Sequence, residues 1–367
     1  MKLLQLFKAL LPCLVMIALC VPASAAITLY DKDNATFSTD GSFNTFYVYS
    51  KDDNADLTQS RVKMGFLPNY IGFNFAKQVG DLKLGGRSSF WVTINDSDNA
   101  TTVTSTGIDV RQFYGTIDAD WGQVLFGKDF ALFNRSNIFR DEILQGFGKT
   151  AGLDASGVSF GNIGSGYTYA LPSAQITYRT PTVSGFKLAV GMVDPARTSG
   201  TGGEETAPRL EGELTYDQTI GTGSVAAWVG ALTQNSTKGA SGDVRSKGLS
   251  YGVNGKIAGL SLTGSGFTGS GLDTSLGAFG TPTDGLDSSG YLVQGSYTIE
   301  KVRLVGSYGK TKLDTATTTE DQTVIGAIFY AINDNLKVEA EYNIETITAG
   351  SADNKIKTIA TGIILNF

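Results

Sequence analysis

Histidine is absent from the sequence, and its only cysteines, Cys13 and Cys20, both precede residue 26. Without histidine the chain can form neither a Ser-His-Asp triad nor a His-ligated zinc site. Without later cysteines, the rest of the chain lacks disulfides and thiolate ligands. The sequence therefore predicts no catalytic residues, no metal site and no cofactor, and the chain is not predicted to be an enzyme.

Long hydrophobic runs are also missing beyond residue 25. No stretch of about 18 apolar residues occurs there, so no membrane-spanning helix is predicted. Positive charge is in deficit, with a formal net charge of -6 at pH 7. An acidic chain binds the phosphate backbone poorly, and no nucleic-acid partner is predicted.

Residues 1–25 have the features of a cleaved secretory signal peptide. Lys2 and Lys8 are positive, residues 9–21 are almost wholly apolar, and residues 23–25 (ASA) fit a cleavage site. Cys20 raises the alternative of lipid attachment, but the preceding Leu19 is large where such signals have a small residue. Cleavage after Ala25 is favoured, which leaves residues 26–367 as the exported domain.

The exported domain alternates between apolar and polar residues with a period close to two, which is typical of β-strands. The clearest example is residues 336–347. Its apolar face consists of Leu336, Val338, Ala340, Tyr342 and Ile344, and its polar face of Lys337, Glu339, Glu341, Asn343 and Glu345.

Short and long connections alternate between the expected strands. Seven short and eight long connections predict sixteen strands, with about 21 residues for each strand and its connection. The long connections are expected near residues 52–56, 96–107, 129–171, 195–208, 234–246, 272–288, 312–320 and 349–354.

A soluble sandwich and a membrane barrel could both use such strands. The barrel is favoured because the polar faces carry charges on strand after strand and the chain ends in an alternating segment, residues 363–367 (IILNF). Closure also satisfies every strand edge in lipid. We expect an all-β fold, a 16-stranded antiparallel transmembrane β-barrel, with the sandwich as the alternative.

The alternation stops at about residues 129–171. A loop of that length is usually functional when it is ordered. It carries Arg135, Arg140, Asp141 and Glu142, and we expect it to fold inward and narrow a water-filled pore.

Strand parity predicts which charges face the pore. The expected basic wall consists of Arg61, Lys63, Lys83, Arg87 and Arg111, with Asp109 among them. Asp141 and Glu142 are expected to face this wall from the loop. A second set is acidic and suggests a mild cation preference: Glu211, Glu213, Glu339, Glu341 and Glu345.

Several segments, in order, resemble the trimeric general diffusion porins of Gram-negative outer membranes. They are residues 27–34 (ITLYDKDN), 111–115 (RQFYG), 121–128 (WGQVLFGK), 141–148 (DEILQGFG) and 175–185 (QITYRTPTVSG), together with the terminal Phe367.

The resemblance implies a homotrimer of sixteen-stranded barrels in the outer membrane, each with its third long loop folded inside. Arg61 and Arg111 match basic wall positions, Asp141 matches an acidic loop position, and Phe367 matches the assembly signal. The chain departs from the family where Gln145 replaces a second loop carboxylate, with Glu142 as the nearest substitute.

These observations together predict a porin for passive diffusion of ions and small hydrophilic solutes. Its expected partners are outer-membrane lipid and lipopolysaccharide. A substrate-selective porin and a non-conducting structural or adhesive barrel remain the alternatives, and the missing histidine argues against a barrel enzyme.

Overall fold

The computed structural model describes residues 26–94, 108–150, 153, 159–197, 203–240, 242–274, 277–314 and 318–367. The expected signal peptide and the whole of the expected loop 96–107 lie outside these residues. The described strands are β1 Ile27–Lys32, β2 Ala35–Asp52, β3 Leu57–Lys63, β4 Asn69–Val79, β5 Leu82–Val92, β6 Ile108–Ala119, β7 Gly122–Phe130, β8 Pro172–Arg179, β9 Phe186–Val193, β10 Arg209–Ile220, β11 Gly223–Gly239, β12 Gly242–Ile257, β13 Leu260–Ser270, β14 Asp287–Ile299, β15 Val302–Asp314, β16 Thr319–Ala331, β17 Leu336–Ala349 and β18 Ala352–Asn366.

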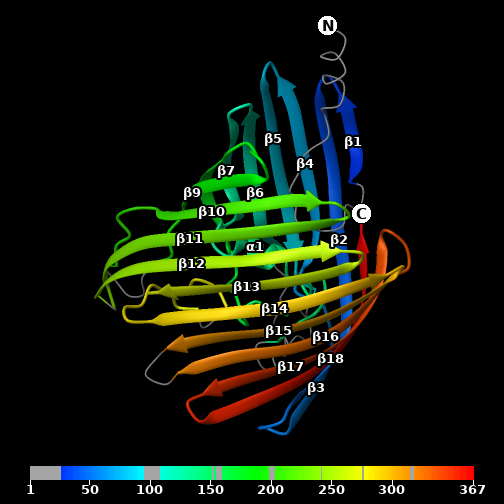
Figure 1. The fold of residues 1–367 in the computed structure, drawn as a ribbon, viewed down its shortest axis with the longest axis vertical. Coiled ribbons are helices and arrows are strands. Elements are labelled where there is room, and N and C mark those ends of the chain that lie inside the picture. Colours follow the sequence, from blue (N-terminus) through cyan, green and yellow to red (C-terminus); the bar gives the residue numbers. More distant parts are fainter. Residues whose placement is uncertain are drawn as a thin grey trace.

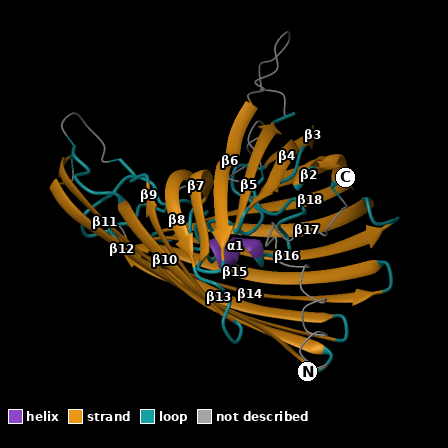
Figure 2. Cartoon of the chain, turned by 90° about the horizontal axis from the view of Figure 1, so that it is seen from above, coloured by secondary structure: helices purple, strands orange, loops and turns teal. Residues whose placement is uncertain are grey.

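The strands form one antiparallel sheet that closes on itself (Figures 1 and 2). Pairing of β9 with β10 and of β18 with β2 completes the ring. Two wall positions each hold two strands. On one edge of β2, β3 pairs with its second half and β4 with its first half. On the other edge, β18 pairs with the second half and β1 with the first half. The eighteen described strands therefore occupy sixteen wall positions, which confirms the predicted sixteen-stranded barrel and rules out the sandwich.

The two ends of the barrel domain meet at the first half of β2. Gly41 and Phe367 exchange backbone hydrogen bonds of 2.8 and 3.0 Å, and Ile27 pairs with Thr39 two residues earlier on β2. The ring of Phe367 stacks on Phe43 with centroids 5.7 Å apart. Strand β1 therefore begins where β18 ends, and the two share one position in the wall.

The two faces of the wall differ as the alternation predicts. Leu304 and Tyr342 face outward and are 42% and 46% exposed, whereas Glu341 and Asn343 on the inner face are buried. An apolar outer face and a polar inner face are the arrangement that a barrel needs in lipid.

The inner face is less uniformly polar than the sequence suggests. Phe46 and Val48 on β2 and Phe329 on β16 face inward and form a buried cluster with Ile143 and Phe147 of the connection between β7 and β8. Because this connection covers part of the wall, apolar side chains there are shielded from water.

Some connections expected to be long are shorter than predicted. Strands β11 and β12 remain paired as far as Gly239 and Gly242, within the expected loop 234–246, and β17 and β18 remain paired to Ala349 and Ala352. These strand ends are rich in serine, threonine, asparagine and charged residues. Backbone pairing continues there after the hydrophobic alternation has faded, so the pattern underestimates strand length.

Candidate functional site

The described residues of the connection between β7 and β8 (131–150, 153 and 159–171) run along the inner face of the barrel. The boundaries of the connection agree within two residues with the expected loop 129–171. The short helix α1 (Arg135–Phe139) of this connection lies among the strands when the molecule is seen from above (Figure 2). Asn137 of α1 accepts a hydrogen bond from Trp228 Nε1 at 2.6 Å and donates to the carbonyl of Gly266 at 3.2 Å. We call residues 131–171 the inner loop.

Carboxylates on β10 hold the start of the inner loop. One oxygen of Glu211 accepts hydrogen bonds from the backbone N–H groups of Leu132 and Phe133, at 2.6 and 2.9 Å. Glu213 accepts one from the N–H of Ser136 at 3.0 Å. Hydrogen bonds to a charged group contribute about 1.5–3 kcal/mol each, so β10 fixes the point where the loop leaves the wall.

A second group of carboxylates, on β16 and β17 near the C-terminal end of the chain, also holds the loop. Glu341 on β17 accepts hydrogen bonds from the N–H groups of Gly148 and Phe147, at 2.7 and 3.3 Å. The Lys149 ammonium donates to Asp321 and lies 3.6 Å from Glu345. Burial lowers the pKa of Lys149, but these two carboxylates outweigh burial and hold the pKa above its usual value.

Asp141 supports the loop from within. Its carboxylate accepts hydrogen bonds from the N–H groups of Ile143 and Asn162, from the Asn162 side chain and from the Tyr167 hydroxyl, at 2.6 to 3.1 Å. Burial raises the pKa of the Asp141 carboxyl, and the hydrogen bonds oppose that shift. The carboxylate thus points into the loop, in contrast to the expected orientation toward the basic wall.

Glu142 and Gln145 point from the loop toward β14, β15 and β17. The Glu142 carboxylate accepts a hydrogen bond of 2.7 Å from Arg303 on β15, and its N–H donates to Gln294 on β14 at 2.9 Å. Gln145 accepts a hydrogen bond of 3.2 Å from Lys337 on β17. The loop side chains expected at the pore therefore contact basic residues that sequence analysis had not assigned to the site.

Two of the expected basic wall residues contact the loop. The Lys63 ammonium lies 5.8 Å from the centre of the Phe147 ring. Arg111 donates to the Tyr169 hydroxyl at 3.2 Å, and its guanidinium lies over Trp91 at 4.9 Å. A bulge in the pairing of β5 with β6 lies directly beside Arg111.

Arg87 and Arg61 belong to the same wall, on β5 and β3. Arg87 donates two hydrogen bonds to Asp40, at 2.7 and 2.9 Å, and a third to Gln112 at 2.8 Å. Gln112 in turn donates to Asp129 of β7, two residues before the inner loop begins. Arg61 lies half-buried on β3, two residues before Lys63.

A further basic pair lies at the start of the loop. Arg135 of α1 and Arg179 of β8 approach the same oxygen of buried Asp129, at 3.8 and 3.7 Å. Strand parity could have placed Arg179 and Arg303 on the inner face. Parity alone gives no signal for Asp321 or Gln294 as contacts of the loop, because it does not say where a loop lies.

The described ranges contain no group of three or more acidic side chains that could hold a metal ion. Nor does any helix in them have the length and apolar character to cross a membrane.

Comparison with protein families gives a match over most of the chain. The family described as Gram-negative porin matches residues 13–346. The comparison with curated proteins gave no match.

Solved outer-membrane structures share the fold. The outer membrane channel DcaP of Acinetobacter baumannii has 18% identity and a TM-score of 0.68, over 93% of this chain and 100% of that one. An anion-selective porin from Comamonas acidovorans has 15% identity and a TM-score of 0.69, over 91% and 100%. OmpF of Salmonella typhi, in complex with daunomycin, has 13% identity and a TM-score of 0.60, over 93% and 100%.

Proposed function

The chain belongs to the Gram-negative porin family, and from this premise we propose that it forms a water-filled channel for passive diffusion of ions and small hydrophilic solutes. The observation that carries this proposal is a long loop held on the inner face of a closed barrel by wall carboxylates. Such a loop reduces the open cross-section and sets a size limit for solutes.

We propose that the narrowest zone lies between the inner loop and the wall formed by β3, β5 and β6. Arg61, Lys63, Arg87 and Arg111 provide its basic side. On the loop side, Glu142 and Gln145 turn toward β14, β15 and β17, and Asp141 contributes by keeping the loop in shape. The channel requires no covalent chemistry and no cofactor, so we propose no enzymatic activity.

The selectivity we propose is for anions. The glutamates that suggested a cation preference are buried, and several hold loop backbone groups, so they act weakly on ions in the bore. Arg87, Arg111 and Arg303 are partly exposed, each in an ion pair with a carboxylate, and Arg61 is half-buried on the same inner face. One structure that shares the fold is described as an anion-selective porin.

The cellular context is also a proposal. Export would follow cleavage of the signal peptide after Ala25, and Phe367 would act as the assembly signal. We propose a homotrimer in the outer membrane, in contact with lipopolysaccharide. OmpT of Vibrio cholerae, which has 18% identity to this chain, is described in a trimer form.

Planar-bilayer recording tests the proposal. Purified, folded protein should give stepwise currents in KCl, and a trimer of independent channels should close in three equal steps. A heat-unfolded sample of the same preparation serves as the control. Folded barrels that carry no current would instead support the non-conducting structural or adhesive barrel.

A further inference from the structure

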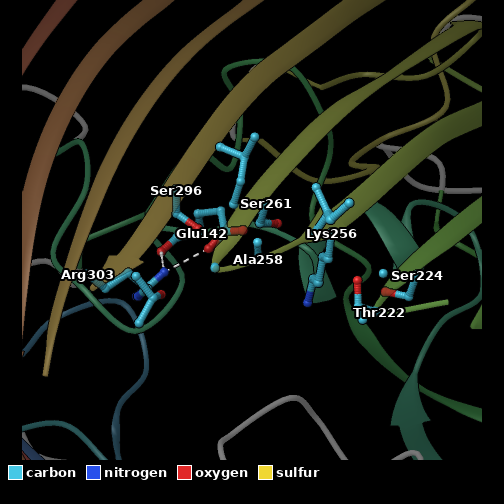
Figure 3. Close-up of a pocket in the computed structure, with 13 residues that line it drawn as sticks. Glu142, Thr222, Ser224, Lys256, Ala258, Ser261, Ser296 and Arg303 are labelled. Atoms are coloured by element: carbon cyan, nitrogen blue, oxygen red, sulfur yellow. Dashed lines mark hydrogen bonds and ion pairs between the residues drawn. The ribbon is translucent and has the colours of Figure 1, made fainter. Parts of the chain in front are cut away.

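A pocket of about 490 Å³ lies inside the barrel at the end where short turns join the strands. Its volume is within the range of small-molecule sites. Turn residues Thr222 and Ala258 form its rim, and strands β11 to β15 form its wall. Glu142 of the inner loop reaches into it (Figure 3).

A strip of polar side chains crosses four adjacent strands of this wall. Ser224 on β11 is paired with Lys256 on β12, Lys256 with Ser261 on β13, and Ser261 with Ser296 on β14. Side chains directly opposite each other on antiparallel strands have Cβ atoms about 4.5–5.5 Å apart. The wall therefore presents three hydroxyls and one ammonium in a row.

The groups in this strip are available to a ligand. Within the described part of the chain, Lys256 Nζ and the hydroxyls of Ser224 and Ser296 have no hydrogen-bond or ion-pair partner. Ser261 Oγ accepts a hydrogen bond from Asn254 at 3.1 Å, which leaves its O–H free to donate. A solute with several acceptors can engage this strip without displacing an existing contact.

The other side of the pocket is formed by a fixed ion pair. Arg303 donates to Glu142 at 2.7 Å, and its guanidinium lies 4.1 Å from the centre of the Phe329 ring. Figure 3 shows this pair on one side of the pocket and Lys256, Thr222 and Ser224 on the other. Glu142 can also accept hydrogen bonds from a hydroxylated solute.

The balance of charge defines the ligand class. The charged side chains of the lining are Glu142, Lys256 and Arg303, and the ion pair leaves the Lys256 ammonium uncompensated. One unpaired cation fits one carboxylate, and the Glu142 oxygens disfavour a second negative charge. The serines and Glu142 fit hydroxyl groups.

We propose that this pocket binds small hydroxylated monocarboxylates, the chemical class of sugar acids, as they pass through the barrel. The carboxylate contacts Lys256, and the hydroxyls contact Ser224, Ser261, Ser296 and Glu142. This inference rests on the proposed channel function and adds to it a preferred solute class.

Occlusion of single-channel KCl current tests the inference. Gluconate is the probe, glucose is the matched neutral polyol, and acetate is a carboxylate without hydroxyls. We expect gluconate to interrupt the current at concentrations about tenfold lower than glucose or acetate, and more readily when added at the short-turn end. Lys256→Gln should weaken gluconate occlusion about tenfold, as expected for loss of one charge-assisted contact.

Two further variants separate the pocket from general charge effects. Lys247→Gln removes the same charge from the same strand, but Lys247 lies exposed on the outer face of β12, so gluconate occlusion should not change. The double variant Ser224→Ala and Ser296→Ala should weaken occlusion by gluconate and leave acetate unaffected.

The outcomes are distinguishable. Equal occlusion by gluconate and glucose, or unchanged occlusion in Lys256→Gln, would overturn the pocket assignment while leaving a conducting channel. A folded wild-type protein without any current would overturn the channel function itself.

Discussion

Gly148 donates its backbone N–H to the carboxylate of Glu341 at 2.7 Å, although the two residues lie 193 positions apart in the chain. This contact joins the inner loop to the strand that precedes the last one. Substitution of Glu341 should therefore loosen the inner loop while the strand pairing of the barrel wall remains intact.

Glu341→Ala is expected to free this part of the loop. Loss of the bonds to Gly148 and Phe147 leaves two backbone donors unsatisfied, at a cost of about 1–3 kcal/mol each. Single-channel recordings should show added open-channel noise, and the folded band should convert to the unfolded one at a lower temperature in a gel-shift assay.

Glu339→Gln is the matched comparison for Glu341→Ala. The Glu339 carboxyl is buried, and Glu341 lies two residues away on the same face. Replacing this carboxyl with a neutral amide should leave thermal stability unchanged or raise it by about 1–3 kcal/mol. A loss as large as that of Glu341→Ala would show that Glu339 also supports the loop.

Replacing residues 136–148 with a short Gly-Ser linker should raise single-channel conductance. The replacement removes the helix and the segment that contacts β14 to β17. A control change in an exposed connection, replacement of residues 53–56 between β2 and β3, should leave conductance the same. Equal or lower conductance after the first replacement would mean that the inner loop does not narrow the bore.

Arg111→Ala and Arg61→Ala should each shift the reversal potential in a KCl gradient toward cation selectivity. Each removes one positive charge from the wall proposed to line the narrowest zone. Arg245→Ala is the control, because Arg245 is exposed on the outer face of β12. A shift in the control as large as in the wall variants would point to overall charge as the cause.

Gly41 and Phe367 are expected to be energetically coupled. A Cβ at position 41 would lie 2.4 Å from the Phe367 ring and 2.8 Å from the carbonyl of Tyr70. Gly41→Ala and Phe367→Ala should each lower the yield of folded barrel, and the double variant should lose less than the sum of both. Strictly additive losses would show that the two residues act independently.

The architecture was predictable because a period of two survives in nearly every strand. Charged residues such as Glu339 and Glu341 alternate with apolar ones over enough positions to specify a face. The boundaries of the inner loop were equally predictable, since the alternation of apolar and polar residues ends at Phe130 and resumes at Pro172.

The roles of individual site residues were harder to predict from the sequence. Parity places Glu211 and Glu341 on the inner face, but it cannot show that the loop backbone lies over them. The orientation of Asp141 depends on Asn162 and Tyr167, which are 21 and 26 residues further along the chain. Contacts made by an irregular loop follow from its three-dimensional course, for which local sequence gives no periodic signal.

The shared wall position of β1 and β18 has a consequence for biogenesis. The seam next to β2 cannot be sealed until the final strand arrives, so a nascent or truncated polypeptide carries two bare edges. In hydrocarbon those edges would leave many polar groups unsatisfied. Membrane insertion should therefore be all-or-none, with incomplete chains left in the periplasm as targets for chaperones and proteases.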